Sequence, residues 1–464
     1  MLKNVSRVLA NTENLKKVNS CFSSDALGRI LVDDLGIPPG ACLKVAYSGG
    51  LDSHVLLHAL ANLRAQQDWS VEVIHIHHGL NDNADIWAQH CRAVCQELGL
   101  ALTIERIHVD RSSPHGLEAE ARQQRYQRLA ASIDEDEVLL TAHHRDDQAE
   151  TLLLQLMRGA GVKGLTSMPA VSSFSEGKHV RPLLAFSRAE LEVYARANRL
   201  SWIDDDSNQD EQHARNFIRH RVMPVLKSRW TEIDSVLART ANHMVEAEIL
   251  LEEVAKRDLL ACQNVPRQLQ LSALLGLPQA HQPNLIRYWI RSWGYRSPAS
   301  YHIREILDCA RRSACRYAAI RWSDAAVYRY RDRLYLITPL PDADRSLRID
   351  WNLAKPLRIP GTRLRLSAES VFGRGLSRDR VSGSSTSVRF RQGGEVCQLP
   401  GRSHHHKLKK LLQEAGIPPW ERQRLPLLYV GSELAAIGDR WVCQPYAAKS
   451  REAGFRLVLQ ETQN

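Results

Sequence analysis

The hydrophobic pattern between residues 41 and 142 switches repeatedly between two periods. Short apolar runs typical of strands occur at 42–47, 71–77, 102–109 and 138–142, and stretches with helical apolar spacing separate them. One helix face, at the spacing i, i+4, i+7, i+8 and i+11, is formed by Trp87, Cys91, Val94, Cys95 and Leu98. Strands that alternate with helices predict an α/β fold with a doubly wound parallel sheet. Ligands of such sheets bind at the carboxyl ends of the strands.

The pattern changes along the rest of the chain, and the changes predict further domains. Residues 226–320 have helical spacing, and Val327–Ile337 alternates around Arg331-Asp332-Arg333 as a β-hairpin does. Gly373–Ser387 is rich in Gly, Ser and Arg, a composition typical of a linker. We therefore expect an N-terminal α/β domain (1–225), a mainly helical domain with a hairpin (226–372), a linker (373–387) and a small α+β domain (388–464).

Composition excludes several classes of protein. The chain of 464 residues is 44% hydrophobic and 25% charged, as expected of a globular protein, and no run reaches the ~18 apolar residues of a membrane span. The start of the chain lacks the apolar core of a signal peptide. Its nine cysteines form no Cys-x-x-Cys pair, so we expect a reducing cytoplasm. The net charge of +10 suits a polyanionic partner or a merely basic enzyme. From Arg389 onward there are 12 Lys/Arg and 7 Asp/Glu, so half of the surplus lies there.

The most informative segment is Ser48-Gly49-Gly50-Leu51-Asp52-Ser53, which follows the apolar run that includes Ala46. The two glycines let backbone N–H groups approach an anion, the serines add hydroxyl donors, and the next helix points its positive end at the same place. A bare Gly-Gly would usually be a tight turn with an N-capping side chain, but the full string after a strand predicts a phosphate cradle. Asp52 would repel a phosphate unless a cation lies between them, so we expect Mg²⁺ at this carboxylate.

This loop is not a Walker A motif, because no Gly-x4-Gly-Lys-Ser/Thr occurs in the chain. It resembles the PP-loop of the ATP pyrophosphatases. That resemblance implies cleavage of ATP to AMP and pyrophosphate, with adenylation of a carbonyl oxygen that a nucleophile then displaces. The string Gly159-Ala-Gly161-Val-Lys-Gly164 matches a dinucleotide-binding pattern, but it follows a helical pattern rather than a strand, which argues against that interpretation.

An acidic string, His143–Thr151, follows the fourth apolar run. If a helix begins near Asp146, Asp147 and Glu150 are i, i+3 neighbours on one face. Such residues are an ordinary acidic first turn, or they form a negative pocket for an ammonium group or Mg²⁺.

A basic string, Leu117–Tyr126, places Arg122 and Arg125 one helical turn apart beside an aromatic ring. The pair is either a solvated face or a device that holds phosphates or a base. Arg215 and Arg219 have i, i+4 spacing, which alone is unremarkable.

Taken together, the strings resemble one PP-loop subfamily, the tRNA(Ile)-lysidine synthetases, in their multidomain branch. The matches cover nearly the whole chain after about residue 40. They are Ser48–Ser53, His78–Leu80, Glu118–Tyr126, His143–Glu150, Arg158-Gly159 with Gly164-Leu165, Arg181–Leu184, Asp206–Asn208 with Arg215-Asn216, Arg391–Glu395, Lys409–Leu412 and Pro418–Arg422. The chain departs from the residues common in the family at His77, Asn81, Asp206 and His213.

The resemblance implies that lysine is joined to C2 of the wobble cytidine, position 34, in the CAU anticodon of tRNA(Ile). Cytosine O2 would attack the α-phosphate of ATP, and the amine of free L-lysine would then displace AMP to give lysidine. The implied cofactors are ATP, on Ala46 and Ser48–Ser53, and Mg²⁺. By the same resemblance, the catalytic residues are Asp52, Asp147, Glu150 and Arg122. The residues that contact lysine or tRNA are Asp147, Glu150, Arg122, Arg125, Arg215, Lys409 and Lys410.

Several other interpretations stay open from the sequence. The His clusters at His75–His78 and His404–His406 lack Cys or acidic partners at ligand spacing, which favours polar or phosphate-contacting roles over a metal site. The basic run Arg402–Lys410, near Trp420, favours contact with an RNA backbone over a solvated face. Rival functions are another PP-loop activity, such as tRNA thiolation or an amidotransferase-type synthetase, and a non-catalytic tRNA-binding protein. A homodimer is also left open.

Overall fold

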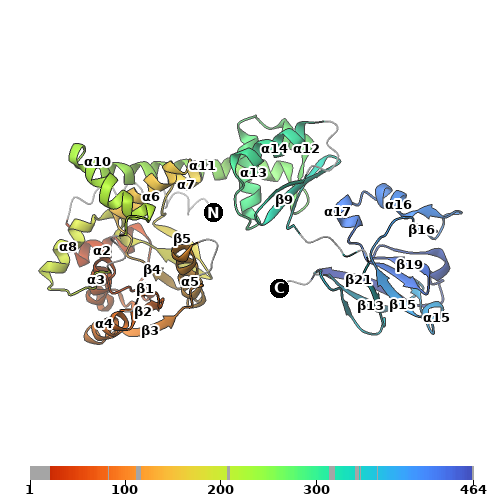
Figure 1. The fold of residues 1–464 in the computed structure, drawn as a ribbon, viewed down its shortest axis with the longest axis horizontal. Helices are drawn as coiled ribbons and strands as arrows, with labels where there is room; N and C mark the ends of the chain where they lie inside the picture. The colour runs from red at the N-terminus through yellow and green to blue at the C-terminus, as the bar shows by residue number, and fades with distance from the viewer. Residues whose placement is uncertain are drawn as a thin grey trace. The chain divides into compact units, whose positions relative to one another are not determined.

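The computed structural model describes residues 21–81, 83–110, 116–205, 210–312, 319–339, 344, 346–362 and 364–461. The chain divides into two compact units between Glu253 and Val254. The division falls within the long helix α11 (Ile233–Cys262), which Figure 1 labels. Within the described residues, none of the helices is both long and apolar enough to cross a bilayer.

The first unit is built on a six-stranded sheet with the strand order β3-β2-β1-β4-β6-β5. Neighbouring strands pair in parallel, except β5 and β6, so the predicted doubly wound parallel sheet is confirmed. Because β1 lies between β2 and β4, the winding reverses beside β1, and a ligand crevice is expected at that point. The strands are β1 (Cys42–Ala46), β2 (Ser70–His77), β3 (Ala101–Arg106), β4 (Val138–Leu140), β5 (Val171–Phe174) and β6 (Gly177–Val180).

Helices cover both faces of this sheet, because alternate strand residues point to opposite sides. Leu43 and Val45 of β1 pack with α3 in one cluster. Ile74 of β2 and Leu139 of β4 pack with Leu129 of α5 in another. The helices are α2 (Ser24–Arg29), η2 (Ile30–Asp34), α3 (Leu51–Gln67), α4 (Ala84–Glu97), α5 (Leu117–Ala131), α6 (Arg145–Met157), α7 (Val162–Leu165), η3 (Pro182–Ala185) and α8 (Arg188–Ala197).

After α8, the chain forms a helical segment in which the helix type changes from α to π and back to α. It consists of α9 (Ala214–Phe217), the π-helical turn η5 (Ile218–Val222) and α10 (Met223–Arg229). In η5 the backbone N–H of Met223 donates to the carbonyl of Ile218, and both side chains pack on α6. Ile233 and Leu237 of α11 join the same cluster. The first compact unit extends past residue 225, where we expected the first domain to end, and reaches Glu253.

The second unit begins with three helices and an antiparallel sheet in the order β7-β10-β9-β8. The predicted hairpin around Arg331 is confirmed as β9 and β10. The prediction missed β7 and β8, which are short and flank the hairpin. The elements are β7 (Gln268–Gln270), α12 (Leu271–Gly276), α13 (His281–Ser292), α14 (Ser300–Arg311), β8 (Ala319–Trp322), β9 (Ala325–Tyr330) and β10 (Arg333–Ile337).

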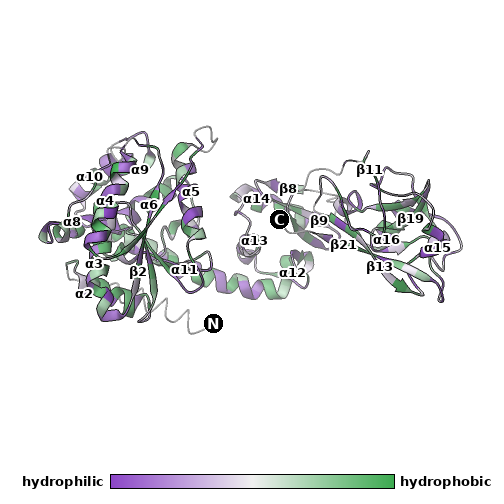
Figure 2. Ribbon diagram, turned by 90° about the horizontal axis from the view of Figure 1, so that it is seen from below, coloured by the Kyte–Doolittle hydropathy of each residue, from purple (hydrophilic) through white to green (hydrophobic). Residues whose placement is uncertain are grey.

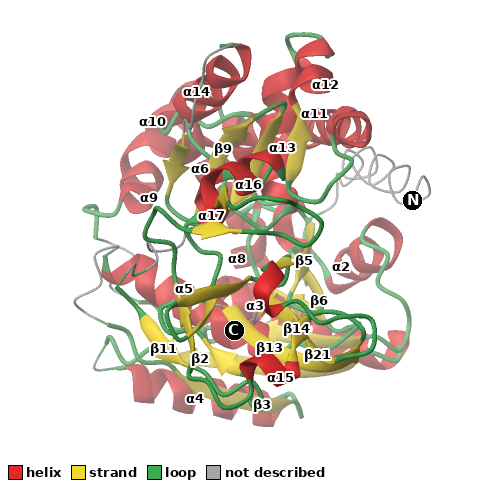
Figure 3. Cartoon of the chain, turned by 90° about the vertical axis from the view of Figure 1, so that its right-hand side faces the viewer, coloured by secondary structure: helices red, strands yellow, loops and turns green. Residues whose placement is uncertain are grey.

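The rest of the second unit contains two further sheets, ordered β11-β15-β18-β19-β20 and β12-β13-β21-β14, and a small ribbon, β16-β17. Figure 3 shows β13, β21 and β14 as neighbouring strands. The elements are β11 (Arg348–Asp350), β12 (Leu357–Arg358), β13 (Leu364–Phe372), β14 (Leu376–Ser377), α15 (Arg378–Val381), β15 (Thr386–Arg389), β16 (Val396–Cys397), β17 (His406–Lys407), α16 (Leu408–Glu414), α17 (Pro419–Arg422), β18 (Leu427–Val430), β19 (Glu433–Ile437), β20 (Trp441–Val442), η6 (Gln444–Tyr446) and β21 (Ala453–Glu461).

This part corrects two predicted boundaries. Residues 373–387 are not a linker: they hold β14, α15 and the start of β15, and Leu376 and Val381 lie in the core. Gly375 allows a close backbone approach, since a Cβ there would lie 2.3 Å from the carbonyl oxygen of Phe455. The C-terminal α+β domain also begins before residue 388, because β11 pairs with β15 and β13 pairs with β21.

Apolar and polar positions alternate along the helices as the periodicity predicts. Figure 2 shows hydrophilic and hydrophobic bands along α11. In α4, Cys91, Val94 and Cys95 are buried, in agreement with the helix face expected from their spacing. The core of the first unit therefore positions β1 and α3, and with them the loop that joins these two elements.

Candidate active site

The turn between β1 and α3 is held in shape by its own serines. The backbone N–H of Ser48 donates to Ser53 Oγ at 3.2 Å, the two Oγ atoms are 2.9 Å apart, and Ser53 Oγ donates to the Gly50 carbonyl at 3.0 Å. Gly49 has φ = +89°, and a Cβ there would lie 2.6 Å from Cδ1 of Ile203. The loop thus needs glycine for both its backbone conformation and its packing.

A cavity of about 470 Å³ lies beside this loop, at the carboxyl ends of β1, β2 and β4. This volume is in the range that binds small ligands. Its position confirms the expectation for a doubly wound sheet. The lining includes Ala46, Ser48, Gly50–Ser53, His75–His78, Arg125, Tyr126, Thr141–His143, Arg188, Ile203–Asp205, Arg219 and His220.

The histidines of the lining are held by polar groups of the protein. His75 Nδ1 is 2.9 Å from the carbonyl oxygen of Tyr47, and His77 Nε2 is 3.1 Å from Asp85 Oδ1. In the described part of the chain, no group of three or more His, Cys, Asp and Glu side chains is arranged to hold a metal. These contacts fit the polar role expected for His75–His78.

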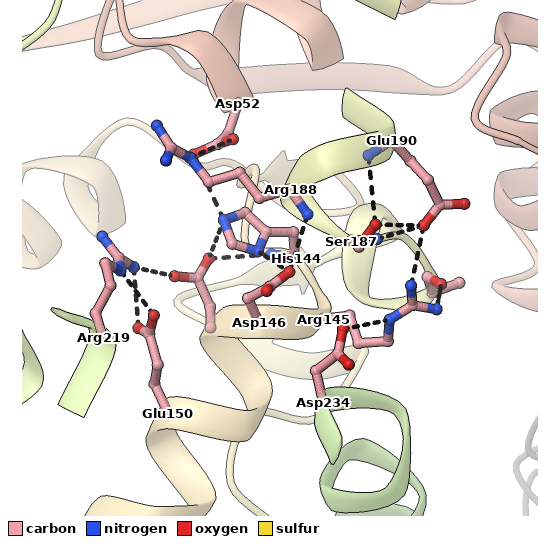
Figure 4. A network of polar contacts seen from close by, with 12 residues as sticks. Asp52, His144, Arg145, Asp146, Glu150, Ser187, Arg188, Glu190, Arg219 and Asp234 are labelled. Carbon is pink, nitrogen blue, oxygen red and sulfur yellow. Dashed lines mark hydrogen bonds and ion pairs between the residues drawn. The ribbon is translucent and has the colours of Figure 1, made fainter. Parts of the chain in front are cut away.

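His144 lies at the start of α6 among three carboxylates (Figure 4). Its Nε2 is 3.6 Å from Asp52 Oδ2 and 3.4 Å from Asp147 Oδ2, and its Nδ1 is 3.6 Å from Asp146 Oδ2. Burial lowers the pKa of His144, but the three carboxylates outweigh burial and raise that pKa above its ordinary value. His144 therefore lies between the phosphate loop and the acidic turn of α6, where the carboxylates favour its protonated form.

Asp147 and Glu150 lie on one face of α6, as their spacing predicts, and two arginines bind both of them. Arg215 donates to Glu150 Oε2 at 2.9 Å and to Asp147 Oδ1 at 3.0 Å. Arg219 donates to Glu150 Oε1 at 2.7 Å, Glu150 Oε2 at 2.9 Å and Asp147 Oδ1 at 3.0 Å. The fourth oxygen, Asp147 Oδ2, accepts the backbone N–H of His144 at 3.1 Å. All four carboxylate oxygens therefore have donors.

The charge state of Asp147 follows from its surroundings. Burial raises the pKa of Asp147, but His144 and Arg215 outweigh burial and lower that pKa to about 2. The side chain of Glu150 is 2% exposed and meets two guanidinium groups. Asp147 is therefore ionised at neutral pH, and the two acids form a compact network with Arg215 and Arg219.

The basic string of α5 meets the cavity on one side. The guanidinium carbons of Arg122 and Arg125 lie 5.1 Å and 5.5 Å from the ring centroid of Tyr126, within the range of a cation–π contact. Among the described residues that line the cavity are Arg125 and Tyr126, but not Arg122. The structure thus places Arg125 nearer to the cavity than Arg122, to which the resemblance gave a catalytic role.

The expected RNA contacts of the C-terminal module lie in the second unit. Lys409 and Lys410 are exposed on α16, and Lys410 Nζ is 4.0 Å from Glu414 Oε1. Nearby, Trp420 packs on Tyr328 with ring centroids 4.6 Å apart. The two lysines lie at the surface, whereas the tryptophan packs against other rings within the unit.

Comparison with known proteins assigns the chain to a family. The PP-loop domain family matches residues 24–226, the TilS substrate binding domain matches 269–335, and the TilS substrate C-terminal domain matches 386–459. A tRNA(Ile)-lysidine synthase of Coxiella burnetii is 40% identical over 90% of this chain and 92% of its own length. The chain belongs to the tRNA(Ile)-lysidine synthase family. A synthase of Alkalilimnicola ehrlichii is likewise 40% identical, over 95% of this chain and 97% of its own.

Among solved structures, a U34-tRNA thiolase of Methanococcus maripaludis matches with a TM-score of 0.40 and 16% identity, over 48% of this chain and 78% of its own. The curated relatives and the three domain families, and not this structural match, confirm the family resemblance seen in the sequence motifs.

Sequence reasoning missed part of the site of this tRNA(Ile)-lysidine synthase family member. Arg219 was noted only for its spacing, yet it makes three hydrogen bonds to the acid pair. Thr141 and His179 also escaped prediction, although both are buried and their side chains are 2.8 Å apart. The signal available was that Arg219 follows Arg215 by one turn, which places two guanidinium groups on one helix face.

Proposed function

We propose that this chain ligates lysine to C2 of the cytidine at position 34 in the CAU anticodon of tRNA(Ile), with consumption of ATP and release of AMP and pyrophosphate. The observation that carries the proposal is the Ser48–Ser53 loop, which opens into a cavity that also contains guanidinium and imidazole groups. Membership of the tRNA(Ile)-lysidine synthase family supports lysine and tRNA(Ile) as the other substrates.

In the first step, cytosine O2 attacks the α-phosphorus of ATP, the bond to the bridging oxygen breaks, and pyrophosphate leaves. The product is a cytidine whose O2 carries the adenylate. The backbone N–H groups of Gly49 and Gly50, the hydroxyls of Ser48 and Ser53 and the N-terminus of α3 are the groups that would bind the phosphates. They are held in one arrangement by the hydrogen bonds within the loop, so little reorganisation is needed when charge develops.

Asp52 suits a Mg²⁺ ion at this site. Its Oδ1 is buried and, among the described residues, has no hydrogen-bond partner. Mg²⁺ is commonly held by one or two carboxylates together with substrate phosphates and water, so one protein carboxylate is sufficient. When bound, the ion would neutralise the charge that develops on the departing pyrophosphate. Arg188, whose Nε is 4.0 Å from Asp52 Oδ1, would supply further positive charge.

In the second step, the lysine side-chain nitrogen attacks C2, the C2–O2 bond breaks, and AMP leaves with the former O2. The nitrogen loses a proton in the process. We assign an ammonium group of lysine to Asp147 and Glu150. Because every carboxylate oxygen of this pair already has a donor, Arg215 or Arg219 would release at least one hydrogen bond when lysine binds.

Recognition of the tRNA requires that the cytidine leave its stack, as it does for other enzymes that act on a base. Arg125 and Tyr126 offer a guanidinium and an aromatic ring at the cavity for the extruded nucleotide. Lys409 and Lys410 are exposed and are assigned to the RNA backbone, which makes tRNA affinity dependent on salt.

The test is incorporation of labelled lysine into tRNA(Ile) with a CAU anticodon, compared with initiator methionine tRNA that carries the same anticodon. We expect ATP-dependent labelling of the first tRNA alone. Pyrophosphate release without lysine incorporation would keep the PP-loop chemistry and replace lysine with another nucleophile. Binding of tRNA without pyrophosphate release would favour the non-catalytic alternative.

A further inference from the structure

Four polar side chains form a hydrogen-bonded series that ends at the wall of the cavity. Nη2 of Arg181 is 3.0 Å from Nδ1 of His179, and Nε2 of His179 is 2.8 Å from Oγ1 of Thr141. The same Oγ1 is 2.8 Å from Nδ1 of His143, which lines the cavity. Thr141 and His179 are 7% and 1% exposed, so solvent does not compete for these contacts.

The direction of every proton in this series follows from the arginine. A guanidinium group can only donate, so Nδ1 of His179 must accept and carries no proton. A neutral His179 then has its proton on Nε2 and donates it to Thr141. Thr141 has one hydroxyl proton, and its other partner among the described residues is His143. Nδ1 of His143 therefore accepts, and the proton of His143 lies on Nε2.

Two further observations agree with neutral rings. Burial is the largest cause that lowers the pKa of His179 to about 3, and Arg181 and Arg122 lower it further. Burial likewise lowers the pKa of His143 to about 3, with Asp147 opposing and Arg181 contributing. Arg181 itself is anchored, because it donates to the carbonyl oxygen of Pro169 at 2.7 Å. The relay, defined as Arg181, His179, Thr141 and His143, thus fixes the proton of His143, a residue of the cavity lining, on Nε2.

We infer that His143 is a specificity-determining residue whose Nε2–H donates a hydrogen bond to N3 of the extruded cytosine. This inference rests on the proposed function. Cytosine N3 is an unprotonated acceptor, whereas uracil carries a proton at N3. Because the relay fixes the proton of His143 on Nε2, this N–H can pair with the acceptor N3 of cytosine. In uracil it would face another donor, the N3–H group. A site built around such a hydrogen bond rejects the mismatched analogue strongly, because buried polar groups are left unpaired.

The same hydrogen bond assists the chemistry at O2 and C2. N3 is the more basic atom of the cytosine edge, so a donor that occupies its lone pair leaves O2 as the nucleophile toward the α-phosphate. When the lysine nitrogen attacks C2, electron density from the C2–N3 bond shifts to N3, and a fixed donor stabilises it there. No proton is transferred from His143 in this scheme, so the neutral ring is retained through both steps.

The experiment compares tRNA(Ile) transcripts that differ only in C34 or U34. The measured quantity is kcat/KM for tRNA-dependent pyrophosphate release, and lysine incorporation into the C34 transcript is measured in parallel. Thr141→Val keeps the side-chain shape but removes the hydroxyl, so His143 can then take either tautomer. We expect the C34:U34 ratio of kcat/KM to fall by about tenfold or more, in line with the cost of an unpaired buried donor. Thr103→Val, on an exposed position of β3, is the matched control and should leave the ratio unchanged.

A second variant covers the case in which Thr141→Val does not fold, as judged by thermal melting. His143→Gln offers either an N–H or a carbonyl oxygen to the cavity, and it should likewise lower the C34:U34 ratio. A structural defect alone would reduce both substrates equally and leave the ratio intact. A wild-type ratio in the folded variant would therefore overturn the role of His143. Absence of lysine incorporation by the wild-type protein would instead overturn the proposed function, so the two failures are distinguishable.

Discussion

Replacement of Glu150 by Ala measures how much the acid pair contributes to the stability of the first unit. The carboxylate is 2% exposed and accepts three hydrogen bonds of 2.7–2.9 Å from Arg215 and Arg219. Removal of one partner of a buried ion pair costs about 3–5 kcal/mol, because a charge is left uncompensated. The two arginines are 28% and 29% exposed and keep Asp147, so water and that carboxylate offset part of the loss. We expect ~2–3 kcal/mol, below the fully buried case.

The assay is calorimetric or urea-induced unfolding. For a folding unit of this size, 1 kcal/mol corresponds to roughly 2–4 °C in Tm, so a loss of ~2–3 kcal/mol lowers Tm by about 4–12 °C. Glu192→Ala is the matched control: it breaks an exposed i, i+4 pair with Arg196 and should cost less than about 1 kcal/mol. The double variant Glu150→Ala with Arg219→Ala should lose less free energy of unfolding than the two single variants together, because it leaves no Arg219 guanidinium without its Glu150 partner. Strict additivity, or a loss equal to that of the control, would refute the reasoning.

Four further outcomes are expected. Gly49→Ala, at a φ of +89°, should abolish ATP-dependent pyrophosphate release while the melting temperature of the second unit is unchanged. Asp52→Ala should abolish the same reaction, and a normal rate in that variant would contradict the Mg²⁺ role. Lys409→Ala with Lys410→Ala should reduce the slope of log affinity for tRNA against log salt by about 1.4–1.8, measured by filter binding, since each phosphate contact contributes about 0.7–0.9. The stability of the first unit should fall as pH drops from about 6.5 toward 3. Burial lowers the pKa of His179 to about 3, so in this pH range the unfolded chain binds a proton at His179 that the folded protein does not bind. His179→Gln should therefore weaken the dependence of the melting temperature on pH.

The sequence alone was sufficient where the chemistry is local. The Ser48–Ser53 loop lies within six consecutive residues between β1 and α3, so its place between a strand and a helix and its need for glycine could be predicted. The network around Glu150 could not, because its partners Arg215 and Arg219 are 65 and 69 positions away along the chain. The relay could not be predicted for the same reason. Thr141 and His179 are 38 positions apart along the chain and meet because β4 and β6 are neighbouring strands.

The error at residues 373–387 has a different cause. Glycine and serine in a run usually indicate flexibility, but at Gly375 the missing Cβ lets one strand pass close to the backbone of another. Gly375 also has a positive φ of +80°, so the ordered strand needs glycine for its conformation as well as for space. Composition does not reveal this order, because it depends on the pairing of β14 with β21, which joins residues 376–377 to 454–455.

The π-helical turn η5 rotates the side chains that follow it, up to Arg229, relative to those that precede it from Ala214 onward. In a regular α-helix, side chains five positions apart, such as Ile218 and Met223, would point about 140° away from each other. The wider turn lets both pack on α6 while Arg215 and Arg219, just before them, bind the acid pair. Loss of a single residue from η5 would restore the regular period and rotate one of these two faces out of register. The segment should therefore tolerate many substitutions but no change in length.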